Sequence, residues 1–316
     1  MQTFPTRYSQ RHLLEQACSQ SRACVVALVV ATRGSSYRKA GALALIDADG
    51  LISGCISGGC LEAQMVAAAH AALGDGNACM LRLDTRTDDD RWFGSQSGCR
   101  GEIDLLLLPH TGDGMHPAIA ALLIAERAHQ CLAICVNTDS ETPTWRVHDQ
   151  RAASASEVIV SIPPTPRILL LGGGPEAPAL IEFAHSVGWW LEVVEHRARY
   201  LAQARLTGAD RVHAARPAEL LAKLDVSMFD AVICATHLYD EDARCLQQLA
   251  ASDVPFIGLL GPRARAEEML LELGSEINTA LISRLHAPVG IAIGAYGPES
   301  VALSIAARLA EAFARA

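Results

Sequence analysis

The second half of the chain alternates short apolar runs with longer amphipathic segments. Four runs typical of strands buried on both faces lie at 167–171, 190–195, 229–234 and 255–260. Helical patterns lie at 175–187, 214–224, 240–250, 263–273 and 298–314. Strands that alternate with helices in this order predict a Rossmann-like, doubly wound parallel sheet for the C-terminal half.

The first half has a less regular pattern. Continuous apolar runs predict strands at 23–32, 103–108 and 131–137, and residues 42–57 predict a hairpin that turns at Asp47-Ala-Asp-Gly50. Alanine-rich or amphipathic segments predict helices at 61–73 and 117–129. We therefore expect an N-terminal mixed α/β domain in front of the Rossmann-like domain.

Prolines mark the expected boundary between the two halves. Ser161-Ile-Pro-Pro-Thr-Pro166 carries three prolines in six residues, which suits a semi-rigid linker. We predict an N-terminal domain at 1–150, a proline-rich linker at 151–166 and a C-terminal domain at 167–316.

Composition narrows the function classes. The chain has 316 residues, half of them hydrophobic, yet no apolar run comes near the roughly 18 residues of a membrane span. The net charge is −9 without a basic block, which argues against nucleic-acid binding. The N-terminus lacks a basic-then-apolar signal pattern, so we expect a cytoplasmic protein without membrane association.

The ten cysteines form no C-x-x-C pair, so a structural zinc site is not indicated. Four lie in apolar runs and are expected to be buried: Cys24, Cys131, Cys135 and Cys234. Cys55, Cys60 and Cys99 differ, because glycines and polar residues surround them.

The segment Ser53–Glu62 is the most informative in the chain. Gly58 and Gly59 allow backbone amides to approach a ligand, and the helix that follows presents unpaired N–H groups. Cys60 lies at the start of this helix, where the pKa of a thiol tends to fall. The segment predicts either a cradle for an anionic ligand beside a thiol, or simply a tight turn with a buried cysteine.

A second glycine-rich turn follows the strand at 167–171. Gly172, Gly174 and Ala177 occupy the small positions of the dinucleotide fingerprint, and Glu195 ends the next strand where such folds hold ribose hydroxyls. The same turn can hold any phosphate. His237 follows a further strand, and it either contacts a phosphate, donates a proton or merely starts a helix.

These segments together resemble one family. The first half matches at Ala31-Thr-Arg-Gly-Ser-Ser36, Gly41-Ala42, Gly54–Glu62 and Cys99-Arg-Gly101. The second half matches at Leu171–Pro175, Thr236-His237, Ile257–Gly261, Pro288-Val-Gly290, Ile293-Gly-Ala295 and Pro298-Glu299. Nearly the whole chain thus resembles the xanthine dehydrogenase accessory proteins, the XdhC/CoxI family of molybdoenzyme maturation factors.

The resemblance implies a chaperone for the molybdenum cofactor (molybdopterin). Such a protein protects the cofactor while a cysteine desulfurase provides its sulfido ligand, and then delivers it to apo-xanthine dehydrogenase or a related molybdenum hydroxylase. These three are the expected cargo and partners, and a homodimer is compatible with the apolar content. Whether the cargo is the mononucleotide or the dinucleotide form of the cofactor, the latter carrying cytosine, stays open.

The resemblance also suggests site residues. Because molybdenum is thiophilic, Cys60 is the first candidate metal ligand or sulfur relay, and Cys99 is the second. The remaining cofactor-binding candidates are Ser35, Ser36, Arg38, Gly58, Gly59, Glu62, Gly172, Gly174, Glu195 and His237. Ser35, Ser36, Arg38 and the neighbouring Lys39 would contact phosphate or pterin, or else form a solvated basic turn.

The chain departs from the family pattern at several positions. Tyr37 stands where proline is more common, and Arg100 where a second glycine is expected. Ala292 replaces an aspartate, and Gly261-Pro262 replaces a glycine-serine pair. These departures predict a divergent member.

Three function classes follow. The first is a non-catalytic, cofactor-binding maturation factor. The alternative is an NAD(P)-dependent oxidoreductase that uses the Rossmann half for a nucleotide, although no clear proton-transfer pair is visible. The third is a sulfur carrier with a persulfide on Cys60 or Cys99.

Overall fold

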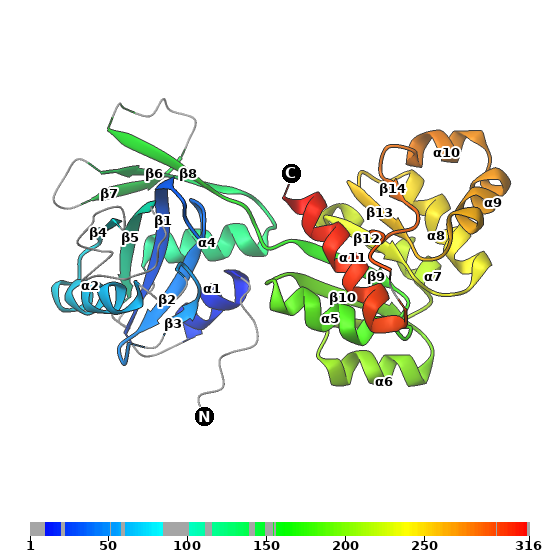
Figure 1. Cartoon of the computed structure of the whole chain (residues 1–316), viewed down its shortest axis with the longest axis horizontal. Helices are drawn as coiled ribbons and strands as arrows, with labels where there is room; N and C mark the ends of the chain where they lie inside the picture. Colours follow the sequence, from blue (N-terminus) through cyan, green and yellow to red (C-terminus); the bar gives the residue numbers. More distant parts are fainter. Residues whose placement is uncertain are drawn as a thin grey trace. The chain divides into compact units, whose positions relative to one another are not determined.

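The computed structural model describes residues 10–19, 23–50, 52–57, 61–84, 101–110, 116–138, 143–148, 154, 156–294 and 296–314. The chain divides into two compact units, Met1–Thr165 and Pro166–Ala316 (Figure 1). We call them unit 1 and unit 2. Four of the predicted site residues lie outside the described residues: Gly58, Gly59, Cys60 and Cys99.

Unit 1 contains a five-stranded antiparallel sheet with the strand order β3-β2-β1-β5-β4. The strands are β1 (Cys24–Gly34), β2 (Leu43–Asp47), β3 (Ile52–Gly54), β4 (Cys79–Asp84) and β5 (Gly101–His110). The predicted hairpin is confirmed, since β2 and β3 pair across the turn at Asp47–Gly50. The long pair β1 and β5 runs from Cys24 opposite His110 to Gly34 opposite Gly101.

The alternating residues of β1 supply two hydrophobic cores, because successive side chains point to opposite faces of a strand. Val25, Ala27 and Val29 pack with α2 (Glu62–Asp75) on one face. Val26, Leu28 and Val30 face the other core, which holds α1 (Gln10–Ser19) and α4 (Pro117–Arg127). A mixed α/β domain is therefore confirmed for the N-terminal half.

A second, three-stranded sheet completes unit 1, with the order β7-β6-β8. Its strands are β6 (Leu132–Asn137), β7 (Thr144–Val147) and β8 (Glu157–Ile162). The prediction that 151–166 is only a linker is therefore wrong for 157–162. Val160 and Ile162 are buried while Ile159 and Ser161 are exposed, a strand alternation that ends where Pro163 begins the proline-rich stretch.

Unit 2 contains a six-stranded parallel sheet with the order β11-β10-β9-β12-β13-β14. The strands are β9 (Arg167–Leu171), β10 (Trp190–Glu195), β11 (Arg211–Ala214), β12 (Ala231–Cys234), β13 (Phe256–Leu259) and β14 (Leu285–His286). The strand order reverses at β9, as in a Rossmann fold. The predicted doubly wound sheet is confirmed.

Helices cover both faces of this sheet (Figure 1). On one face lie α5 (Ala177–Ser186), α6 (Ala198–Thr207) and α11 (Pro298–Phe313). On the other lie α7 (Pro217–Leu221), α8 (Tyr239–Ala250), α9 (Arg263–Leu273) and α10 (Ser275–Leu281). A short 3-10 helix, Val226–Met228, precedes β12.

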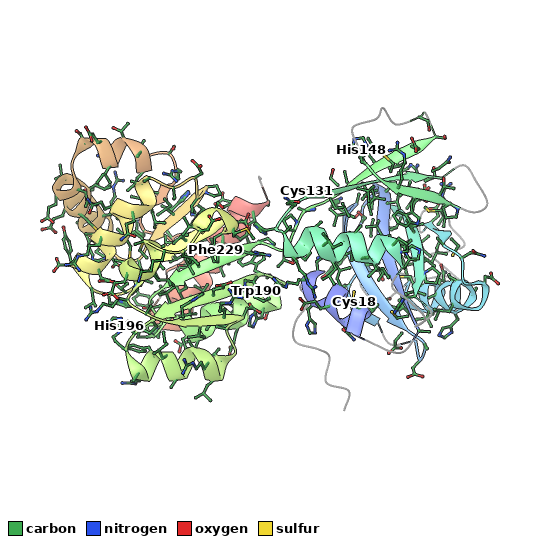
Figure 2. The ribbon with its side chains drawn as sticks, turned by 180° about the vertical axis from the view of Figure 1, so that it is seen from behind. Cys18, Cys131, His148, Trp190, His196 and Phe229 are labelled. Atoms are coloured by element: carbon green, nitrogen blue, oxygen red, sulfur yellow. The ribbon has the colours of Figure 1, made fainter. Side chains whose placement is uncertain are left out.

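The sequence patterns did not predict α6, α10, β11 or β14, and α7 is shorter than the helix expected at 214–224. The edge strands β11 and β14 are short and only partly buried, so they carry no continuous apolar run. Of the four cysteines expected to be buried, Cys24, Cys135 and Cys234 are. Cys131 is exposed, because it precedes β6 instead of lying within it (Figure 2).

Among the helices of the described segments, none is long and apolar enough to cross a lipid bilayer.

Candidate functional site

The turn between β3 and α2 is held by Glu62, the first residue of α2. The Ser57 hydroxyl donates to Glu62 Oε1 at 2.8 Å, and the backbone N–H of Leu61 donates to Glu62 Oε2 at 3.1 Å. Ser57 and Leu61 flank Gly58, Gly59 and Cys60 in the sequence. Glu62 therefore fixes both sides of this triplet, and its charge also suits the positive end of the helix dipole.

A described thiol, Cys55, lies at the start of the same turn. Its Sγ donates to the carbonyl oxygen of Ser57 at 3.0 Å. Burial raises the pKa of the Cys55 thiol, the nearby Arg38 guanidinium acts in the opposite direction, and the Glu62 carboxylate raises the pKa further. The fold thus brings Arg38 and Glu62, two predicted site residues, close to one thiol that the sequence had only singled out by its polar surroundings.

The predicted basic turn lies at the end of β1. Ser35 and Arg38 are exposed, and Lys39 Nζ donates to the half-buried Ser36 hydroxyl at 3.4 Å. The first residue of β5 packs directly against this turn, since a Cβ at Gly101 would lie 1.9 Å from the Ser35 carbonyl oxygen. Only glycine fits there, which explains the glycine that follows Cys99-Arg100 in the sequence.

A cluster of four charges at the same end of the sheet was not predicted. Arg33 Nη1 bonds Glu102 Oε1 at 2.5 Å and Asp104 Oδ2 at 3.2 Å. Arg82 Nε lies 2.8 Å from Asp104 Oδ1 and 3.2 Å from Glu102 Oε1. Both carboxylates are buried, whereas both arginine side chains are more than half exposed. The sequence feature that could have indicated this cluster is the pair Glu102 and Asp104, two acids at alternate positions within the apolar run of β5.

In unit 2, the glycine-rich turn between β9 and α5 lies against the end of β12. Gly172 has φ +112, and a Cβ there would lie 2.3 Å from the Ala235 carbonyl oxygen. Gly172 therefore allows the close approach of the turn to β12. Gly174 lies against the His237 ring, since a Cβ at Gly174 would come within 2.9 Å of His237 Nε2.

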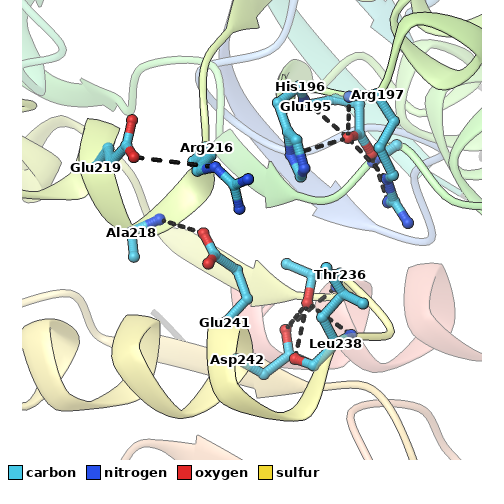
Figure 3. A network of polar contacts seen from close by, with 11 residues as sticks. Glu195, His196, Arg197, Arg216, Ala218, Glu219, Thr236, Leu238, Glu241 and Asp242 are labelled. Carbon is cyan, nitrogen blue, oxygen red and sulfur yellow. Dashed lines mark hydrogen bonds and ion pairs between the residues drawn. The ribbon is translucent and has the colours of Figure 1, made fainter.

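Glu195 is almost fully engaged with the protein itself (Figure 3). Its carboxylate accepts five hydrogen bonds of 2.6–2.9 Å, from the backbone N–H groups of Gly173, His196 and Arg197 and from two guanidinium nitrogens of Arg197. Burial alone would raise its pKa, but the bonds from Arg197, Gly173 and His196 outweigh burial and lower the pKa to about 2.

These contacts bear on the nucleotide hypothesis. A carboxylate has about four acceptor sites, so a ribose diol would have to displace Arg197 from Glu195. The residues present therefore do not fit NAD(P) in the way that the fingerprint suggested. Glu195 instead ties β10 to the glycine-rich turn of β9 through the N–H of Gly173.

His237 reaches across the same turn. It adopts a left-handed backbone conformation, with φ +62, and its Nε2 lies 3.0 Å from Glu176 Oε2 near the start of α5. The hydrogen bond that His237 donates to Glu176 raises the pKa of His237, aided by the charges of Glu176 and Asp242 and opposed by burial and Arg197. His237 is thus paired with an acid of its own chain.

Thr236 beside it has a structural role. Its hydroxyl donates to the buried Asp242 at 2.7 Å, and Asp242 also accepts from Arg265 at 2.8 Å. Within the described segments, no three His, Cys, Asp or Glu side chains are grouped so that they could hold a metal ion.

Comparison with known proteins gives matches in both halves. The XdhC and CoxI family model matches residues 17–84, and the XdhC Rossmann domain model matches residues 168–309. A protein of Bacillus subtilis (strain 168), named as a probable subunit of xanthine dehydrogenase, is 29% identical over 321 residues. The matched region covers 94% of this chain and 95% of that relative.

Two further proteins are similar over most of their length. The molybdenum cofactor insertion chaperone PaoD of Escherichia coli (strain K12) is 24% identical, over 93% of this chain and 85% of PaoD. A crystal structure described as a xanthine dehydrogenase from Bacillus halodurans superposes with a TM-score of 0.81 at 25% identity, and covers 97% of this chain and 96% of that one.

Proposed function

Since this chain belongs to the XdhC and CoxI family, we propose that it binds the molybdenum cofactor and delivers it to an apo-enzyme of the xanthine dehydrogenase type. The proposal includes protection of the cofactor while a cysteine desulfurase supplies the sulfur for its sulfido ligand. The observation that carries it is the similarity over 93% of the chain to a protein named as a molybdenum cofactor insertion chaperone.

The chemistry of unit 1 supports this function. Arg38 is exposed beside the turn that leads into α2, and Arg33 and Arg82 keep more than half of their side chains exposed at the end of the sheet. Guanidinium groups suit the phosphate of molybdopterin. Cys60 follows Gly58-Gly59 in the sequence between Ser57 and Leu61, and a thiolate suits the soft molybdenum centre.

We further propose that Cys60 is the thiol that contacts the metal, with Cys99 as the second candidate. Glu62 would keep the turn in shape by its bonds to Ser57 and Leu61. A sulfur-carrier role for either cysteine is the variant of this proposal in which the thiol holds a persulfide. Mass spectrometry of the protein after incubation with a desulfurase and cysteine separates carriage of sulfur from passive holding of the cofactor.

The test measures binding of molybdenum cofactor, released anaerobically from a donor enzyme, to wild type and to Cys60→Ala. Cys131→Ala is the matched control, because Cys131 is also in unit 1 and is exposed outside the turn. Loss of binding in Cys60→Ala alone supports both the carrier role and the thiol contact. Binding by all three proteins keeps the carrier role and transfers the thiol assignment to Cys99. Failure of the folded wild type to bind contradicts the proposal.

A further inference from the structure

Unit 2 has a cavity whose lining includes none of the predicted site residues. It measures about 670 Å³ and lies between α11, the end of β13 and the segment that follows β14. Its apolar walls include Leu260, Val289 and Ile305. This volume is in the usual range for small-molecule sites, about 300–1,000 Å³.

One cation of the cavity lining is incompletely paired. Arg308 Nη1 donates to Glu311 Oε2 at 2.9 Å, but the buried Arg308 Nε has no hydrogen-bond partner among the described residues. Nε is closed to a ligand because it has almost no accessible surface, but 34% of the Arg308 side chain remains exposed. The exposed part of this side chain gives the cavity lining a positive charge for an acceptor of a ligand.

An aromatic surface lines the same cavity. The His286 ring is stacked on Phe256 with centroids 4.1 Å apart and an interplanar angle of 9°. Burial lowers the pKa of His286 and the Arg308 charge lowers it further, while Glu311 opposes them, so His286 is uncharged at neutral pH. It offers a flat ring next to the guanidinium, without a second positive charge.

The described residues that line the cavity include no acid, so none of them neutralises the charge of Arg308. Ala292, which is exposed, also belongs to the lining. An acceptor of a ligand would therefore meet no competing carboxylate among the described residues of the lining.

We propose that this cavity binds a planar heteroaromatic ring that bears a carbonyl or carboxylate, with the ring beside His286 and the acceptor on the guanidinium of Arg308. The identity of the ring rests on the proposed function: it is the pterin or the nucleobase end of the molybdenum cofactor. The pterin and the nucleobase are both flat and both carry a ring carbonyl. Separate binding measurements with a pterin and with a nucleotide show which of the two the cavity takes.

The test uses 6-carboxypterin and cytidine 5′-monophosphate as probes, with hexanoate as a carboxylate that lacks a ring. Binding to wild type is measured by titration calorimetry and compared with Arg308→Met and with the control Arg263→Met. The control also removes an arginine paired along its own helix, with Glu267, but on the exposed surface of α9. We expect at least one ring probe to bind, about tenfold more weakly to Arg308→Met and unchanged to Arg263→Met.

A second pair of variants tests the cavity without a change to Arg308. Ala292→Asp places a competing carboxylate in the lining, and Ala292→Asn is nearly the same size without the charge. We expect at least tenfold weaker binding to Ala292→Asp than to Ala292→Asn. Absence of binding by both ring probes, equal binding of hexanoate, or equal affinities for the two Ala292 variants would overturn the proposal.

The outcomes also separate this inference from the proposed function. Binding of whole cofactor to wild type and Arg308→Met with equal affinity leaves the carrier role and removes the cavity. Arg308-dependent binding of a ring probe, combined with no binding of whole cofactor by wild type, leaves the cavity and removes the carrier role.

Discussion

In both units the sequence has glycines between a strand and a helix, and in both an acid accepts one backbone N–H next to or within that segment. In unit 1 the acid is Glu62, at the start of the helix itself. In unit 2 it is Glu195, from the neighbouring strand β10. The unit 1 turn is thus fixed by local contacts, whereas the unit 2 turn depends on the pairing of β9 with β10.

The difference changes what each turn can do. In unit 1 the exposed Arg38 lies near Cys55 and Glu62, so a positive charge is available there to a ligand. In unit 2, beside Gly172–Gly174, the Glu195 carboxylate already accepts five hydrogen bonds, and His237 is paired with Glu176. A chain can therefore match the dinucleotide fingerprint in sequence although the polar groups that would bind the nucleotide are already bonded to other groups of the protein.

The largest expected effect is that of Gly172→Ala, which tests how tightly the unit 2 turn packs. The new Cβ would lie 2.3 Å from the Ala235 carbonyl oxygen at a positive φ, so we expect a loss of about 4 kcal/mol of unfolding free energy. Urea unfolding, with hydrogen exchange of peptides from β9 and β12, measures it.

Gly274→Ala is the matched control for this change. Gly274 also has a positive φ, +92, but no atom lies within 4 Å of the position of its Cβ. The control should lose only the strain part, about 1 kcal/mol. Equal losses for the two variants would show that the turn does not pack closely against β12.

The second effect concerns the acid of unit 2. The pKa of Glu195 is about 2 in the folded chain, compared with 4.5 as its ordinary value, so its ionised form stabilises the fold by about 3 kcal/mol. Because the folded pKa is depressed, this stability is present above about pH 4.5 and is lost as the pH falls toward 2. Glu195→Gln should lose about 3 kcal/mol at pH 7 and have a flatter stability profile between pH 4.5 and 2.

Unfolding of wild type and Glu195→Gln across this pH range decides the point. A variant with the wild-type profile would mean that the five donors to Glu195 do not stabilise its charge.

A smaller effect is expected in unit 1. Glu62→Gln weakens the hydrogen bonds from Ser57 and Leu61. We expect the free energy of unfolding to fall by about 1 kcal/mol, because the net contribution of each hydrogen bond to stability is small. On the proposed function, it also weakens cofactor binding several-fold. Glu299→Gln is the control, since Glu299 lies in the first turn of α11 and shares only the effect of the helix dipole.

Urea unfolding measures the change in stability of both variants, and titration with the cofactor measures the change in their affinity. Equal changes in Glu62→Gln and Glu299→Gln would mean that the dipole alone accounts for the role of Glu62.

The smallest effect is at the pair Glu176–His237. Pairing raises the pKa of His237, so its contribution is full below about pH 6.5 and is lost as the pH rises through the raised folded value. The His237 side chain is 43% exposed and solvent screens the pair, so Glu176→Gln should lose only about 0.5 kcal/mol near pH 6. The loss should vanish near pH 9, and a loss that is the same at both pH values would exclude an ionic contribution.

The sequence patterns located the strands that are buried on both faces. The boundaries of β9 and β10 match the prediction to the residue, because continuous apolar runs such as Arg167–Leu171 end sharply at polar or glycine positions. The same patterns failed for β11, whose residues are only partly buried, and for β8, whose alternation was masked by the prolines that follow it.

Site prediction had a similar limit. The sequence identified Glu62, Arg38, Glu195 and His237 by residue type and position, but not the partners of their side chains. Arg38 lies near Cys55, 17 positions away in the sequence, and Gly173 donates to Glu195 from 22 positions away. The cluster of Arg33, Arg82, Glu102 and Asp104 depends on the register of β1, β5 and β4.

The sequence by itself determined the two halves, the parallel sheet, the family and the residue types of both turns. These properties follow from local periodicity, from glycine and proline positions, and from the order of motifs. Only the tertiary structure decided that the acceptor sites of Glu195 are occupied, that Arg38 lies near Cys55 and that Arg308 lines a cavity. Whether a polar group is free for a ligand depends on strand pairing and helix packing, which bring together residues that are distant along the chain.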